Sequence, residues 1–204
     1  SLLMNNVPMW IVKLYFVFFR LHQRLHQFFI PLFKKKSDHK VFCVGMWKTG
    51  TTSLCQGLKI LGYRTGRLLR GGKKPKCGWI EYIKKSNYDA FTDDPMIFVY
   101  KELDKIYPNS KFILTIRNKD SYIKSYYNYF EGTKLEKKPE EKDKILKDYE
   151  EHNNEVREYF KDRPDKLLEI NIIGGENWEK LCPFLEKPIP KTPFPHKNKG
   201  RYNK

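Results

Sequence analysis

The stretch Val41-Phe42-Cys43-Val44-Gly45-Met46-Trp47-Lys48-Thr49-Gly50-Thr51-Thr52-Ser53-Leu54 carries the strongest local signal in this sequence. Its first five residues form an apolar run typical of a buried strand, and a helical pattern follows from Thr51 to Leu61. Glycines bracket the loop between them. A strand, loop and helix in this order direct several backbone N–H groups and the positive end of a helix dipole at one point. The sequence therefore predicts a phosphate-binding loop, to which Lys48 and the threonine hydroxyls add charge and donors.

This loop departs from the nucleoside-triphosphate pattern G-x-x-x-x-G-K-[ST]. The residue after Gly50 is Thr51, where that pattern has lysine, and the lysine lies earlier, at Lys48. The next clear strand ends in Arg117, where a magnesium-dependent NTPase would have aspartate. An arginine at that place suits a phosphate rather than a metal. A nucleotide kinase or NTPase stays an alternative, with these positions against it.

From Lys40 onward, short apolar runs alternate with helical patterns, which predicts an α/β domain with a mainly parallel sheet. Further strands are expected at Ala90–Thr92, Lys111–Ile116 and Leu167–Ile170, and further helices at Met96–Ile106, Lys119–Phe130, Asp143–Phe160 and Glu176–Phe184. Residues 64–78 and 132–142 are expected to be loops. The proline-rich tail is expected to lie extended over the surface.

The segment around Lys48 resembles the 5′-phosphosulfate loop of sulfotransferases that use PAPS (3′-phosphoadenosine-5′-phosphosulfate), whose loops read P-R-T-G-T-T-S-L or P-K-[SA]-G-T-T-W-L. Residues 117–127, Arg-Asn-Lys-Asp-Ser-Tyr-Ile-Lys-Ser-Tyr-Tyr, are similar to the 3′-phosphate motif of that family, R-[DN]-P-x-x-x-x-x-S-[YF]-[YF]. Lys119 replaces the usual proline. The likeness covers about residues 39–200 and is to a branch of small single-domain enzymes. It implies a three-layer fold like that of the P-loop NTPases.

The resemblance also implies the chemistry. PAPS would be the co-substrate, PAP the product, and no metal would be required. The implied nucleotide site consists of Trp47, Lys48, Thr49, Gly50, Thr51, Thr52, Ser53, Arg117 and Ser125. Lys48 would relieve charge on the leaving phosphate, and the acceptor would be a small molecule or a glycan with a hydroxyl or an amine. A protein that holds an anionic ligand without turnover is a further alternative.

The base that activates an acceptor hydroxyl is open between several carboxylates. The resembling branch has an aspartate just before a proline at a strand end, which corresponds to Asp93 or its neighbour Asp94. Asp93 is the expected base, with Asp94 and Glu81 in reserve, and a helix N-cap ahead of Pro95 is the competing role for either aspartate. The histidines His152 and His196 are expected to be surface or cap residues.

Composition limits the partners. The 204 residues suffice for one compact domain, and 40 lysines and arginines against 24 acidic residues leave a net charge of +16. That excess favours anionic partners, and no tract resembles a nucleic-acid-binding module. The four cysteines, Cys43, Cys55, Cys77 and Cys182, lack metal-ligand spacing. They are expected to be reduced thiols, which favours a reducing, cytoplasmic compartment.

Residues 1–38 match no family pattern and are expected to form a segment separate from a catalytic domain at 39–204. Their apolar run is interrupted by Lys13, Arg20 and Arg24 at helical spacing, which predicts an amphipathic helix rather than a spanning one. Residues 7–33 of this helix would pack on the domain, lie on a membrane surface, or act as a signal anchor of the Golgi type. These three alternatives stay open.

Overall fold

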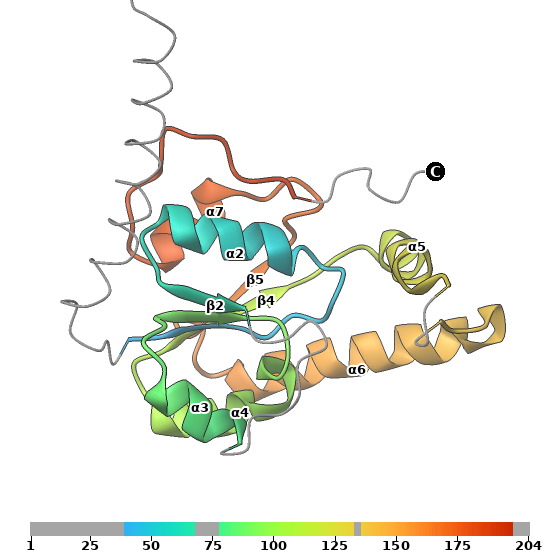
Figure 1. The fold of residues 1–204 in the computed structure, drawn as a ribbon, viewed down its shortest axis with the longest axis horizontal. Coiled ribbons are helices and arrows are strands. Elements are labelled where there is room, and N and C mark those ends of the chain that lie inside the picture. Colours follow the sequence, from blue (N-terminus) through green and yellow to red (C-terminus); the bar gives the residue numbers. More distant parts are fainter. Residues whose placement is uncertain (1–38, 68–77, 133–135, 198–204) are drawn as a thin grey trace, which may run out of the picture. The chain divides into compact units, whose positions relative to one another are not determined.

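The computed structural model describes residues 39–67, 78–132 and 136–197, and its strands and helices are labelled in Figure 1. Five strands are present in these ranges: β1 (Val41–Cys43), β2 (Thr65–Arg67), β3 (Ala90–Thr92), β4 (Lys111–Thr115) and β5 (Leu167–Ile170). The helices are α2 (Thr51–Ile60), α3 (Trp79–Lys85), α4 (Met96–Ile106), α5 (Lys119–Phe130), α6 (Lys142–Phe160) and α7 (Trp178–Phe184), with a 3₁₀ turn at Pro139–Glu141.

The strands form one sheet in the order β2-β3-β1-β4-β5, and all of the pairs are parallel. The central strand β1 pairs with β3 on one side, where Val41 faces Ala90, and with β4 on the other, where Val41 faces Lys111. This confirms the predicted α/β fold with a parallel sheet. The chain passes from β1 to the edge strand β2 and then to β3, and it later crosses from β3 to β4 on the other side of β1. The direction in which strands are added therefore reverses at β1, and ligands bind parallel sheets at such a reversal.

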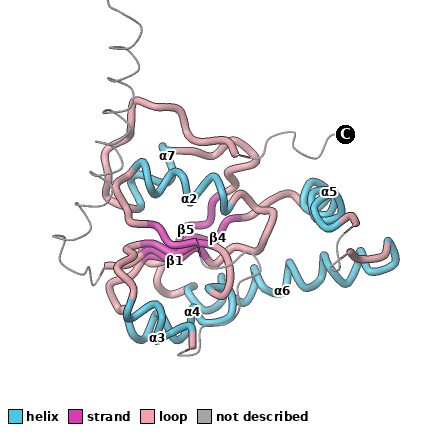
Figure 2. Tube along the Cα trace, viewed as in Figure 1, coloured by secondary structure: helices cyan, strands magenta, loops and turns pink. Residues whose placement is uncertain are grey.

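Helices cover both faces of the sheet, as Figure 2 shows. On one face α2 and α7 pack on the strands around Leu54, Leu58 and Leu181, all fully buried. On the other face α3, α4 and α6 pack around Phe42, Phe91 and further apolar side chains. The alternating apolar runs of the sequence are thus buried on both faces, as a parallel sheet requires.

Two elements were not predicted. The first is β2, in the stretch 64–78 expected to be a loop, and the second is α3. The strand β2 is short, contains Gly66, and owes its extended form to pairing with β3 rather than to apolar periodicity. Helix α3 has seven residues and only one fully buried side chain, Ile83, so its hydrophobic pattern is faint.

The expected N-terminal helix at 1–38 lies outside the described residues and stays a prediction, as does the domain boundary after it. Within the described ranges, no helix has both the length and the hydropathy to cross a bilayer. Cys43, Cys55 and Cys182 are buried and free, as expected for reduced thiols, and Cys77 lies outside the described residues.

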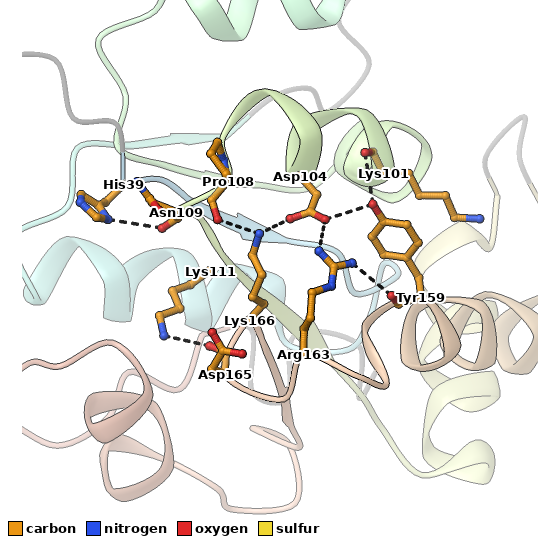
Figure 3. Close-up of polar contacts among 10 residues, drawn as sticks. All are labelled: His39, Lys101, Asp104, Pro108, Asn109, Lys111, Tyr159, Arg163, Asp165 and Lys166. Atoms are coloured by element: carbon orange, nitrogen blue, oxygen red, sulfur yellow. Dashed lines mark hydrogen bonds and ion pairs between the residues drawn. The ribbon is translucent and has the colours of Figure 1, made fainter.

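A cluster of charged side chains joins the elements at the amino ends of the strands (Figure 3). The Asp104 carboxylate, from α4, is buried and accepts hydrogen bonds from the ammonium of Lys166, from Arg163 at 2.5 Å, and from the hydroxyl of Tyr159 at 3.0 Å. Lys166 and Arg163 precede β5, so the cluster ties α4 to the segment between α6 and β5. It lies at the edge of the sheet opposite to the phosphate loop.

Candidate functional site

The predicted site residues gather at the carboxyl edge of the sheet. Because the strands are parallel, the segments that follow β1, β3 and β4 leave the sheet at this same edge. They carry, respectively, the loop with Lys48, the pair Asp93 and Asp94, and Arg117. Figure 1 shows the β1–α2 connection and α5 on this side of the sheet.

The β1–α2 loop takes backbone conformations that suit an anion cradle. Lys48 and Gly50 have φ angles of 69° and 103°, in the left-handed region, which turns successive N–H groups toward one side. Gly45 has no room for a side chain, since an added Cβ would lie 2.0 Å from the Thr115 hydroxyl oxygen. No side chain caps α2, whose N-cap is Gly50, so the helix start offers its first N–H groups to a ligand.

Two of the predicted hydroxyl groups are already used inside the fold. Thr49 is fully buried, and its hydroxyl donates to the Met46 carbonyl at 2.5 Å. It lies 2.6 Å from the Thr115 hydroxyl, which must then be the donor of that second bond. Ser53 is buried as well, and its Oγ accepts a hydrogen bond from the Lys197 backbone at 3.0 Å. These two residues can offer their backbone N–H groups to a ligand, while their hydroxyls hold the loop and the tail.

Arg117 connects the loop to helix α5. Its guanidinium donates to the Ser121 hydroxyl at 2.6 Å and to the Lys48 carbonyl at 3.0 Å. Its backbone is held by Tyr149, whose hydroxyl accepts from the Arg117 N–H at 2.8 Å and donates to the Arg117 carbonyl at 2.9 Å. Burial lowers the pKa of Arg117, but the ordinary pKa of a guanidinium is so high that the group stays charged.

Ser125, which is predicted to reach the same phosphate as Arg117, is not among the hydrogen-bond partners of the Arg117 guanidinium in the described part of the chain. Ser121 is one of them. The two serines lie four residues apart on α5 and so on the same side of the helix, and Tyr129 continues this row. The spacing i, i+4, i+8 was present in the sequence and would have indicated Ser121 and Tyr129 as further site residues.

The side chains of Lys48 and Trp47 reach the end of α5. The Lys48 ammonium lies over the Tyr129 ring, 3.9 Å from its centroid. The Trp47 ring meets the Phe130 ring edge-on, with centroids 6.1 Å apart, and keeps 37% of its surface exposed. Helix α5 thus contacts the loop at its first turn through Ser121 and Arg117, and at its last turn through these two rings.

The two aspartates after β3 differ in their surroundings. Asp93 has a φ of 71°, in the left-handed region, and is half-buried. Burial raises the pKa of Asp94, against a hydrogen bond from the Trp47 side chain that lowers it, and its Oδ1 is buried with no hydrogen-bond partner in the described part of the chain. Neither aspartate caps α4, whose N-cap is Pro95 without a side-chain bond, so the N-cap role is wrong for both.

Glu81 and His152 lie in other settings than this pair. Glu81 is 43% exposed on α3 and pairs with Lys84 at 3.9 Å and Lys85 at 3.7 Å. His152 was expected at the surface, but it is half-buried on α6 and its Nε2 lies 2.7 Å from the Val44 carbonyl. Burial lowers the pKa of His152, so the neutral ring donates its N–H to the loop backbone. His152 therefore holds the start of the β1–α2 loop through its contact with the Val44 carbonyl. His196 is exposed in the tail, as expected.

Comparison with known proteins agrees with this geometry. A family model described as a sulfotransferase domain matches residues 40–139 and 128–202. The Ava biosynthesis cluster protein M of Aspergillus versicolor is 26% identical over 211 residues, which cover 77% of this chain and 80% of that protein. The matched ranges include the β1–α2 loop, the pair of aspartates and the Arg117–Ser121 contact. The chain therefore belongs to the sulfotransferase domain family.

Proposed function

We propose that this protein transfers a sulfuryl group from PAPS to an acceptor hydroxyl or amine and releases PAP. The observation that carries the proposal is the Arg117 guanidinium, which donates to Lys48 of the loop and to Ser121 of α5. PAPS bears phosphates at both its 5′ and 3′ positions. A donor with two separate anionic groups needs two cationic sites at a constant distance. The two hydrogen bonds of Arg117 would keep the predicted 5′- and 3′-phosphate sites at such a distance.

The β1–α2 loop would bind the 5′-phosphosulfate. The hydrogen-bond donors would be the backbone N–H groups from Thr49 to Ser53, which include the uncapped start of α2. These donors do not require a positively charged side chain at each position. The Thr51 and Thr52 hydroxyls would assist, and Lys48 would supply the mobile charge. Arg117 and the α5 serines Ser121 and Ser125 would bind the 3′-phosphate.

The transfer itself needs little covalent work from the protein, since an SO₃ unit passes in line between two oxygens. Lys48 donates an N–H to the bridging oxygen while the bond from that oxygen to sulfur breaks and its electron pair moves to the 5′-phosphate. Asp93 takes the proton of the acceptor hydroxyl as its oxygen bonds to sulfur. The proton thus ends on the carboxylate and the negative charge on PAP.

The surroundings of Asp94 and Glu81 make each of them less suited than Asp93 to act as the base. Its carboxyl group is engaged with the Trp47 side chain and has one buried oxygen, so it is less suited to contact an acceptor. Glu81 is paired with lysines on the outer face of α3. Asp93 remains the carboxylate that follows β3 directly.

Thermal unfolding with nucleotides tests the proposal. At a hundred times its dissociation constant PAP should stabilise the fold by about 2.7 kcal/mol, a clear rise in Tm, whereas ATP with magnesium should give much less. Equal protection by ATP would favour the nucleotide kinase or NTPase instead. PAP binding without turnover of PAPS across a broad panel of alcohols, phenols, amines and glycans would favour a binding protein without catalysis.

A further inference from the structure

The Lys48 ammonium and the Tyr129 ring come from segments far apart in the sequence, yet they meet at 3.9 Å. Such a distance is well inside the range at which a cation is attracted to the negative face of an aromatic ring. Both side chains are half-buried, so water screens this attraction less than it would on an open surface. The contact is therefore an energetic one and not a chance approach of two exposed groups.

We propose that Tyr129 is a positioning residue for Lys48. Its ring face holds the ammonium close to the loop, from where it would donate an N–H to the leaving phosphate oxygen. This inference rests on the proposed function, in which Lys48 neutralises the charge that develops on that oxygen. Nothing in the family resemblance assigns a role to Tyr129.

Lys166 of the same protein shows the alternative way to hold an ammonium. That group is bound to the Asp104 carboxylate, which neutralises its charge and takes up its hydrogen bonds. An aromatic ring offers no lone pair and no full negative charge, so it attracts the ammonium without neutralising it. The Tyr129 contact is of this weaker kind, so by itself it adds little resistance when the ammonium follows the developing charge. A catalytic lysine needs an aromatic partner of this kind, which leaves its charge in place. A structural lysine is served by a carboxylate.

The ring of Tyr129 is itself held by its neighbours. It meets the Phe130 ring edge-on, with centroids 4.9 Å apart, and Phe130 packs on Tyr126 at 4.7 Å. At the other end of α5, the Arg117–Ser121 contact fixes the first turn to the Lys48 carbonyl. Helix α5 thus joins the predicted 3′-phosphate site to the Lys48 side chain, so that a donor bound at one end meets a lysine already placed by the other.

The positioning role can be tested by lowering the negative charge on the face of the ring in steps while the shape of the side chain stays nearly the same. Tyr129→Phe should keep kcat close to that of the natural protein, because the ring remains. Phenylalanines with increasing numbers of fluorine atoms at this position should lower kcat step by step, to roughly a tenth for the most fluorinated ring, with little change in KM for PAPS. Tyr129→Leu should lower kcat by about the same factor.

The matched control is Tyr107, at the end of α4, whose ring centroid lies 5.4 Å from the Lys40 ammonium and which is no part of the predicted site. The same fluorinated series at Tyr107 should leave kcat unchanged. A flat response to fluorination at Tyr129, or equal losses at both positions, would overturn the positioning role while sulfuryl transfer by the natural protein stood.

A second measurement does not depend on turnover. In nuclear magnetic resonance spectra, the Hε protons of Lys48 should be shifted to low frequency by the ring current of Tyr129, and Tyr129→Leu should remove that shift. If the natural protein shows no sulfuryl transfer, the proposed function fails and the catalytic part of this inference fails with it. If transfer occurs but the Lys48 shift is the same in the natural protein and in Tyr129→Leu, the inference alone is wrong.

Discussion

At the scale of single residues, Arg117 combines observed structural contacts with a predicted role in binding a phosphate. Its Nε and Nη1 atoms are engaged with Ser121 and with the Lys48 carbonyl. A guanidinium has five N–H donors in a plane, so others remain for a phosphate. Ser125, one turn further along α5, would approach the same phosphate from the helix.

Arg117→Ala and Ser125→Ala are expected to weaken PAP binding far more than binding of adenosine 5′-phosphosulfate, which lacks the 3′-phosphate. A charged hydrogen bond left unmade costs about 1.5 to 3 kcal/mol, which is roughly a tenfold to hundredfold rise in Kd. Isothermal titration calorimetry with both nucleotides measures the difference. Lys124→Ala, an exposed site on the same helix, is the control and should change neither Kd. Equal losses for the two nucleotides would count against the assignment of the 3′-phosphate.

Asp93→Asn should preserve shape and remove the base. PAP should therefore bind nearly as before, while turnover of an aliphatic alcohol falls by roughly 10²- to 10⁴-fold. A phenol of low pKa should be affected less, because its hydroxyl is partly ionised without help. Asp94→Asn, which keeps an oxygen for the Trp47 side chain, is the matched comparison. If Asp94→Asn abolishes turnover and Asp93→Asn does not, the base is Asp94.

At the scale of elements, the phosphate loop is held in place from its sides. The Thr49 hydroxyl bridges the loop to the Thr115 side chain at the end of β4, and His152 of α6 contacts the Val44 carbonyl. Gly45 lets the loop approach β4 closely. The predicted anion cradle is thus shaped by β4 and α6 as well as by its own sequence.

Thr49→Val should therefore reduce the stability of the fold although the volume is nearly conserved. The change leaves the Met46 carbonyl and the Thr115 hydroxyl without their buried partner, a loss of about 1 to 3 kcal/mol in the free energy of unfolding. Urea denaturation measures it. Thr49→Ser keeps the hydroxyl and should lose clearly less. The same midpoint for Thr49→Val and the natural protein would mean that the bridge contributes nothing.

At the scale of the whole molecule, the predicted site and a cluster of buried and half-buried charges occupy opposite edges of one sheet. The predicted site lies where the strands end, and the Asp104 cluster of Figure 3 lies where they begin. Burial acts to raise the pKa of Asp104, but the hydrogen bonds from Lys166, Arg163 and Tyr159 outweigh it and leave this pKa below its ordinary value of 3.8. The folded state therefore favours the ionised carboxylate.

The sign of the pH effect follows from that direction. The contribution of Asp104 is fully present above the unfolded pKa and is lost as pH falls through the lower folded pKa, so stability should decline below about pH 4. Asp104→Asn should cost about 1.5 to 3 kcal/mol at neutral pH, because the partly exposed Lys166 and Arg163 lose their charged hydrogen-bond acceptor. It should also flatten this acid decline in urea denaturation series. The control is Asp162→Asn, on the exposed turn before β5, which should leave the curve unchanged. An equally steep decline in Asp104→Asn would show that other carboxylates cause it.

Local patterns were sufficient for most of the fold. The alternation of apolar runs and helical periods predicted four of the strands and five of the helices, because each signal is contained in a few neighbouring residues. The loop around Lys48 and Arg117, which follows β4, were predicted in the same way, from glycine spacing and from the residue type expected at a strand end. Strand β2 and helix α3 were not predicted from the sequence, because contacts with neighbouring elements stabilise them and their own apolar patterns are faint.

The sequence by itself determined a parallel α/β domain, and it predicted an anion-binding loop and a second cationic position for a phosphate. Only the tertiary structure decided that Arg117 bonds Ser121 and the Lys48 carbonyl, and that Tyr129 lies against the Lys48 ammonium. It also decided that Asp104 is buried among cations and that His152 supports the loop. Most of these contacts join residues distant along the chain, and they exist only because the strand order brings β1 between β3 and β4. Local periodicity contains no information on that order, because it reflects the packing of the whole core.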